Sequence, residues 1–210
     1  MTFGDIGLWD WGSIVKTIIG AGVGSAIIQG LLPYLRDRRH RADQAAYMSL
    51  RLAVTLEFYT LACADFVQKN QNAQRPPEAE YPDWDPELPE LPPYPDDIDG
   101  WRAVDRGLAS ACLNLRNAIH ASRGLVNATI EYSMDDLGDV LTEQAAKRGI
   151  EAWRIASKLR RVSNFDPVEN SWDFVSMLET KLKSATASKQ HRQERNADIM
   201  LDLDKLTAPE

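Results

Sequence analysis

Cysteine is scarce in this chain of 210 residues, and the common motifs of catalysis and metal binding are missing. There is no C-x-x-C, no H-E-x-x-H, no Walker A loop and no G-x-G-x-x-G. No glutamate is followed three positions later by a histidine, the pattern that holds paired metals in helical bundles. We therefore predict a non-enzymatic protein with no catalytic residue, no cofactor and no metal site.

The two cysteines that are present, Cys63 and Cys112, sit among alanines and leucines in separate helical patterns. In a reducing cytoplasm such residues behave as small apolar side chains, so we expect both to be buried and free. A disulfide or redox pair is the alternative.

Positive charge is also in short supply. The chain has 24 lysines and arginines against 31 acidic residues, a net charge of −7. Without a basic face to replace the counterions of phosphates, a nucleic acid is excluded as a partner. The one basic cluster follows the apolar segment described next, and we expect it to bind anionic lipid headgroups through Arg36, Arg38, Arg39 and Arg41.

Only one long apolar run exists, at residues 14–35. As a helix it would reach about 33 Å, which matches a hydrocarbon core of about 30 Å. Trp9 and Trp11 precede it and Tyr34 ends it, where amphipathic rings suit the membrane interfaces. We predict a transmembrane helix, although Lys16 and Gln29 interrupt it. An interfacial helix or a helix of a packed core is the alternative.

The charges on the two sides of this run predict its orientation. Residues 1–13 contain no lysine or arginine, whereas four arginines follow the run. The positive-inside rule therefore places residues 1–13 outside and the bulk of the chain in the cytoplasm, anchored in the cytoplasmic membrane. Small residues spaced four apart favour close helix packing and hence a possible homo-oligomer. These residues are Gly20, Gly22, Gly24, Ala26 and Gly30.

The remainder predicts an all-α fold, with residues 36–183 forming an antiparallel bundle of about four helices. The first helix runs to about residue 70 with an apolar seam at intervals of four and three, formed by Leu52, Leu56, Tyr59, Cys63 and Phe66. Further helices are predicted near residues 101–130, 137–162 and 166–183, the last from the cap signal Asp166-Pro167. Residues 184–210 are predicted to be a polar, partly disordered tail.

Residues 70–100, hereafter the strap, hold eight of the eleven prolines and nine acidic residues. Neither a helix nor a central strand is compatible with this composition. Aromatic and leucine side chains recur through the strap, so we predict that it lies across the outside of the bundle. A proline-rich docking ligand for another protein and plain disorder are the alternatives.

Two carboxylates, Glu57 and Asp65, are embedded in the first bundle helix. They could pair with Arg116 or a metal inside the bundle, and an enzyme would require all three to converge in one pocket. The simpler interpretation is that they lie on the polar flank of the helix.

The layout resembles a group of uncharacterised bacterial single-pass membrane proteins. The resemblance rests on the Trp-rich start, the arginine cluster and several short motifs, such as Leu56-Glu57-x-Tyr59, Leu91-Pro92-x-Tyr94-Pro95, Arg116-Asn117 and Trp172-Asp173-Phe174. It implies organisation only, because it brings no activity. We therefore expect a membrane-anchored scaffolding module that binds an unknown cytoplasmic protein. A bilayer-permeabilising effector is the alternative.

Overall fold

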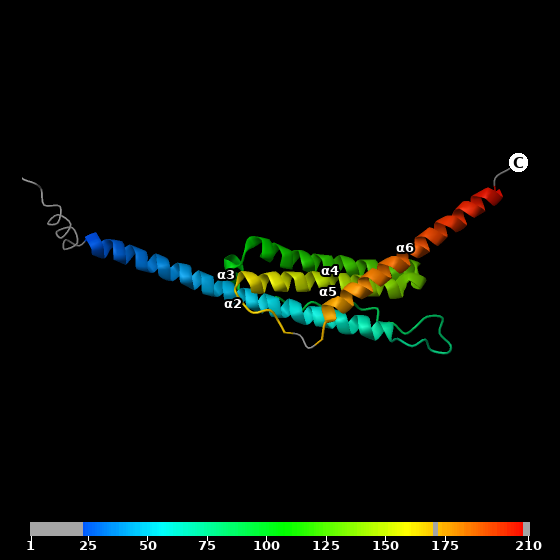
Figure 1. Cartoon of the computed structure of the whole chain (residues 1–210), viewed down its shortest axis with the longest axis horizontal. Helices are drawn as coiled ribbons and strands as arrows, with labels where there is room; N and C mark the ends of the chain where they lie inside the picture. The colour runs from blue at the N-terminus through cyan, green and yellow to red at the C-terminus, as the bar shows by residue number, and fades with distance from the viewer. Residues whose placement is uncertain (1–22, 170–171, 208–210) are drawn as a thin grey trace, which may run out of the picture. The chain divides into compact units, whose positions relative to one another are not determined.

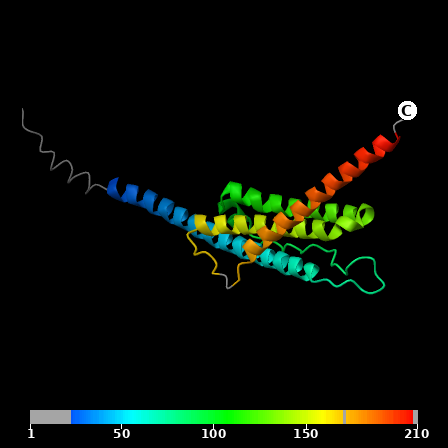
Figure 2. The ribbon, with the colours of Figure 1, turned by 45° about the vertical axis from the view of Figure 1, so that its right-hand side comes forward.

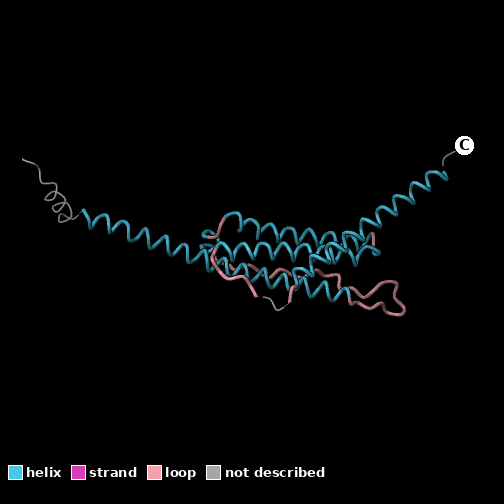
Figure 3. Tube along the Cα trace, in the orientation of Figure 1, coloured by secondary structure: helices cyan, strands magenta, loops and turns pink. Residues whose placement is uncertain are grey.

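The computed structural model describes residues 23–169 and 172–207, and this part of the chain consists of helices and loops (Figure 3). The chain divides into two compact units, residues 1–44 and residues 45–210. The described residues of the first unit belong to helix α2 (Val23–Gln71), which continues into the second unit. The arginines at 36, 38, 39 and 41 are all exposed.

The predicted membrane span at residues 14–35 lies partly outside the described residues. Within the described chain, no helix combines the length and the apolar character that crossing a membrane requires. Of the small residues predicted to pack between copies, Gly20 and Gly22 also lie outside the described part, whereas Gly24, Ala26 and Gly30 belong to α2.

The second unit confirms the all-α bundle, with four long helices packed together (Figure 1). After α2 come α3 (Ile98–Ala103), α4 (Arg106–Tyr132), the 3-10 turn η1 (Met134–Asp136), α5 (Leu137–Val162) and α6 (Phe174–Thr207). Helix α5 packs against both α4 and α6. The side chains of α2 join those of α4 and α5 in the core.

Helix α4 runs parallel to α2, in contrast to the antiparallel order that we predicted. The N-terminal part of the α2 seam packs with Leu115, and its C-terminal part packs with Val126, farther along α4. The reason is the strap, which leaves the end of α2 and returns along the bundle before α4 begins (Figure 2). The connection through η1 is short, so α5 is antiparallel to α4.

The seam predicted on α2 is confirmed, because all five of its side chains are buried. Helices α2 and α5 approach closely at Gly149, where a Cβ atom would lie 2.9 Å from Cβ of Cys63 and 3.0 Å from Cδ1 of Leu178. Thr60 uses this proximity to donate a hydrogen bond of 3.1 Å to the Gly149 carbonyl oxygen. An alanine at position 149 would therefore push α2 and α6 away from α5.

Helix α6 starts and ends later than predicted. It begins at Phe174 rather than near Asp166, because Asp173 supplies the cap by accepting a 3.1 Å hydrogen bond from the amide of Ser176. It then continues to Thr207 instead of ending near Lys183. Lys189 pairs with Glu143 of α5 at 3.4 Å, so the helix still contacts α5 beyond residue 183.

Candidate docking site on the Pro-rich strap

The strap is bound to the bundle through a repeat of three residues. Leu88 and Leu91 are buried in the core and Tyr94 is half-buried against it. A polyproline II helix has three residues per turn, so residues three apart share one face. The repeat therefore gives the strap one buried row of leucine, leucine and tyrosine.

The other two rows are less buried: the second is half-buried except at its first position, and the third is exposed. Prolines occupy the second row at positions 86, 89, 92 and 95. The third row is exposed and acidic, with Glu87, Glu90 and Asp96 at its first, second and fourth positions. Because no lysine or arginine occurs between positions 76 and 101, this row carries uncompensated negative charge along the strap itself.

Hydrogen bonds to every third carbonyl fix this register. Arg123 and Arg116 of α4 donate to the carbonyl oxygens of Pro89 and Pro92 at 3.3 and 3.4 Å. One turn farther, the Trp101 indole donates to the Pro95 carbonyl at 3.0 Å. Three residues of a polyproline II helix span about 9 Å, and the seven-residue step from Arg116 to Arg123 spans about 10.5 Å along α4. The spacing of the two arginines therefore matches the spacing of the carbonyl groups that they bind.

Tyr94 makes three different contacts with the bundle and α3. Its hydroxyl donates a 2.8 Å hydrogen bond to the Cys112 carbonyl oxygen, and its ring lies 5.7 Å from the Trp101 ring in an edge-on arrangement. The Arg116 guanidinium sits over the same ring, 4.8 Å from its centre. Burial raises the pKa of the Tyr94 phenol well above its usual range, so the hydroxyl remains a donor.

The start of the strap is tied to the end of α2. The side chain of Asn70 donates to the Asp85 carbonyl oxygen at 3.1 Å and accepts from the Asp85 amide at 2.8 Å. The Lys69 ammonium lies 2.9 Å from the Asp85 carboxylate, and this hydrogen bond lowers the pKa of that carboxyl. Trp84 packs so closely on α5 that a Cβ atom at Gly138 would lie 2.8 Å from its ring.

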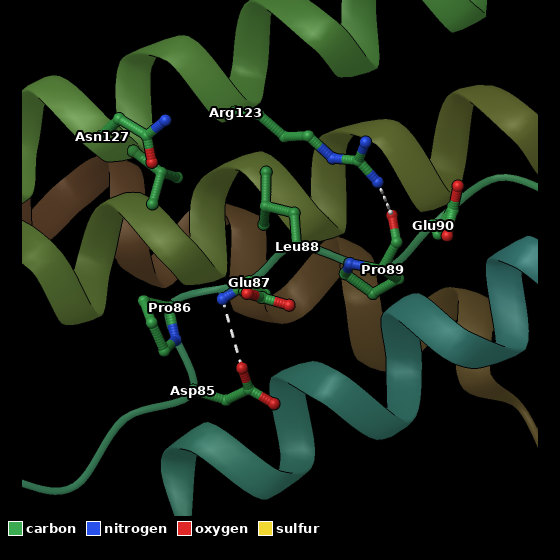
Figure 4. A pocket seen from close by; sticks show the side chains of 9 residues that line it. Asp85, Pro86, Glu87, Leu88, Pro89, Glu90, Arg123 and Asn127 are labelled. Carbon is green, nitrogen blue, oxygen red and sulfur yellow. Dashed lines mark hydrogen bonds between the residues drawn. The ribbon is translucent and has the colours of Figure 1, made fainter.

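A cavity of about 570 Å³ opens between the strap and α4 (Figure 4). Leu88 and Val126 contribute apolar walls, and Glu87 and Glu90 contribute carboxylates. Figure 4 shows Arg123 reaching from α4 to the Pro89 carbonyl, so this arginine already has an acceptor. The lining of the groove is mostly polar and includes two exposed carboxylates, which suits a cationic side chain.

The three residues considered for an enzymatic pocket do not converge. Glu57 forms a two-pronged ion pair with Arg160 of α5, with N–O distances of 2.5 and 2.8 Å. Asp65 is exposed, and Arg116 is engaged with the strap. Within the described residues, no group of three or more histidine, cysteine or acidic side chains has a geometry suited to a metal ion.

Both cysteines are buried and free, which confirms the prediction for Cys63 and Cys112. Burial raises the pKa of Cys63 to about 12 and that of Cys112 to about 11. Both thiols are therefore protonated at neutral pH and are poor nucleophiles.

The roles of Arg123 and Arg160 were not predicted from the sequence. A signal for Arg123 was present, because it follows Arg116 by two helical turns and the leucine and tyrosine positions of the strap repeat every three residues. For Arg160 no local pattern exists, since its partner Glu57 is 103 positions away.

By fold and site, the chain is an all-α bundle that carries a proline-rich strap in a fixed register on its surface. Comparisons with protein-family models, with curated proteins and with solved structures found no match to this chain. Its role is therefore inferred from the arrangement of its own side chains.

Proposed function

We propose that this chain is a membrane-tethered, non-enzymatic interaction module whose strap docks a cytoplasmic protein. The observation behind this proposal is the three-sided strap, in which one row is bound to the core, the proline row is mostly half-buried and the acidic row is exposed. A segment already held in its extended conformation loses little further entropy when a partner binds it. Polyproline segments are used as ligands for this reason.

The negative charge of the strap indicates the kind of partner that it binds. The exposed acidic row, whose Glu87 and Glu90 also line the neighbouring groove, favours a protein surface rich in lysine or arginine. A basic side chain entering the groove would place its stem against Pro86 and Pro89, which are the more exposed apolar residues of the lining. The partner we propose is therefore a basic protein surface, and a nucleic acid is not proposed.

The tether is the apolar segment 14–35, followed by the exposed arginines 36, 38, 39 and 41, which suit anionic lipid headgroups. We propose the cytoplasmic membrane with the N-terminus outside. Association of copies through the small residues from Gly20 to Gly30 belongs to the same proposal.

Fractionation tests the tether. The full chain is expected to remain in membranes after a carbonate wash, whereas a chain that starts at Arg36 is expected in the supernatant. Recovery of the full chain in the supernatant would contradict the tether without bearing on the strap. Toxicity on overexpression that disappears in a Gly20→Leu, Gly24→Leu variant would favour the bilayer-permeabilising effector instead.

Site-specific photocrosslinking tests the docking. A photoreactive residue at Glu90 is expected to give one discrete protein adduct in cells, and the same residue at Glu80, outside the three-residue repeat, serves as the matched control. Combining the Glu90 probe with Glu87→Gln and Asp96→Asn is expected to remove the adduct. Equal adducts at Glu80 and Glu90, or adducts that survive neutralisation, would refute a charge-selective docking row.

A further inference from the structure

A second cavity, of about 520 Å³, lies on another part of the bundle, where the chain leaves α5 for α6. Its walls are apolar and ring-rich, contributed by Trp153 of α5 and by Phe165, Pro167 and Val168 of the connecting segment. The volume falls in the range of about 300 to 1,000 Å³ that small-molecule sites occupy. None of these residues contributes to the strap, so this cavity is independent of the docking role.

The connecting segment is held in place by hydrogen bonds to the end of α5. Asn164 has φ = 55°, a left-handed conformation that asparagine tolerates and that turns the chain back at the end of α5. The amide of Phe165 then donates to the Arg160 carbonyl oxygen at 2.9 Å. The Arg160 side chain donates to the Asp166 carbonyl oxygen at 3.3 Å, so the cavity wall is built in advance of any ligand.

The charges around the cavity leave one cation available. Glu57 and Arg160 neutralise each other in their paired geometry, and only 12% and 17% of their side chains are exposed. Arg161 also lines the cavity, is exposed, and forms no ion pair with any residue that the structure describes. Ser157 and Asn164 add a hydroxyl and an amide to the same lining.

We infer that this cavity binds a compact aromatic carboxylate. The aromatic part would pack against Trp153 and Phe165 in stacked or edge-on contact. The carboxylate would accept hydrogen bonds from Arg161, whose planar guanidinium matches it in a two-pronged geometry. A dianion would exceed the single available charge, and a neutral ligand would leave that charge unused.

Calorimetric titration of the full chain tests this inference with a matched pair of probes, indole-3-acetate and indole-3-acetamide. The carboxylate is expected to bind about three- to fivefold more tightly than the amide, the ratio that an exposed ion pair supports. Arg161→Gln is expected to abolish this preference. Arg154→Gln is the control, since Arg154 is an exposed arginine two turns earlier on α5 and outside the cavity.

Ser157→Phe, which fills the cavity, is expected to remove binding of both probes while circular dichroism stays that of the native chain. No binding of indole-3-acetate up to about 1 mM, or equal affinity for acid and amide, would overturn the inference. So would a preference that persists in Arg161→Gln, which is a surface change and does not depend on how Ser157→Phe folds. Decanoate binding as tightly as indole-3-acetate would overturn the aromatic assignment.

Discussion

Replacing Leu91 with alanine measures how firmly the strap is bound. Only 7% of the Leu91 side chain is exposed, and it packs in the same cluster as Leu56, Tyr59 and Ile119. The substitution removes three carbon atoms, each worth about 0.8 kcal/mol of burial, or about 2.4 kcal/mol in total. A residual cavity would add to this cost, but a surface segment can settle into the space, so we expect a loss of about 2 to 3 kcal/mol.

The assay is urea unfolding of the full chain, followed by far-ultraviolet circular dichroism. For a chain of this size the expected loss corresponds to a fall in Tm of about 5 to 10 °C. Glu90→Ala, on the exposed row one residue before Leu91, is the control and is expected to stay within about 0.5 kcal/mol of the native chain.

The comparison of the two variants decides the question. If Leu91→Ala and Glu90→Ala have the same stability, the strap does not contribute its leucine row to the core. The docking proposal would then lose its basis, because an unbound strap has no fixed proline and acidic rows.

Three further predictions concern charges and thiols. Glu57→Gln is expected to lower the free energy of unfolding in urea by about 3 kcal/mol, because it leaves Arg160 without its carboxylate partner. Replacing both residues with methionine is expected to restore most of this loss. A double variant as unstable as the single one would contradict this prediction. Cys63 and Cys112, with pKa values raised to about 12 and 11, are expected to react with a thiol reagent at pH 8 only in denaturant, and rapid labelling of the native chain would contradict their burial. The pKa of Asp85 is lowered by its hydrogen bond with Lys69. The contribution of this contact to stability is therefore complete above about pH 4 and is lost as the pH falls through the lowered pKa. An NMR titration of Asp85 with a midpoint at or above the ordinary value would refute the contact.

The α2 seam was predictable from the sequence because it depends only on local spacing. Leu52, Leu56 and Tyr59 recur at helical intervals, and burying such a row is the only way to remove it from water. The position of the strap on the outside of the bundle was also predictable, since prolines exclude it from any helix while its leucines and tyrosines require burial.

The start of α6 shows where local signals fail. Asp166-Pro167 is a good cap sequence, yet Asp173 is used instead, and the Phe174 ring that follows it packs edge-on against Trp153 at 5.2 Å. Both aspartates suit a cap position, and the helix begins at the one whose next residue also packs against a distant helix. The contact between Phe174 and Trp153 cannot be predicted from residues 160–175 alone, because Trp153 lies outside that segment.

The sequence was sufficient to predict the helical class, the seam of α2, the burial of Cys63 and Cys112 and the extended conformation of the strap. Each of these follows from a repeat or a composition that acts over a few residues. The parallel order of α2 and α4 and the pairing of Glu57 with Arg160 depend on the tertiary structure. The ion pair joins residues 103 positions apart, and its energy depends on how whole helices pack, which local spacing does not encode.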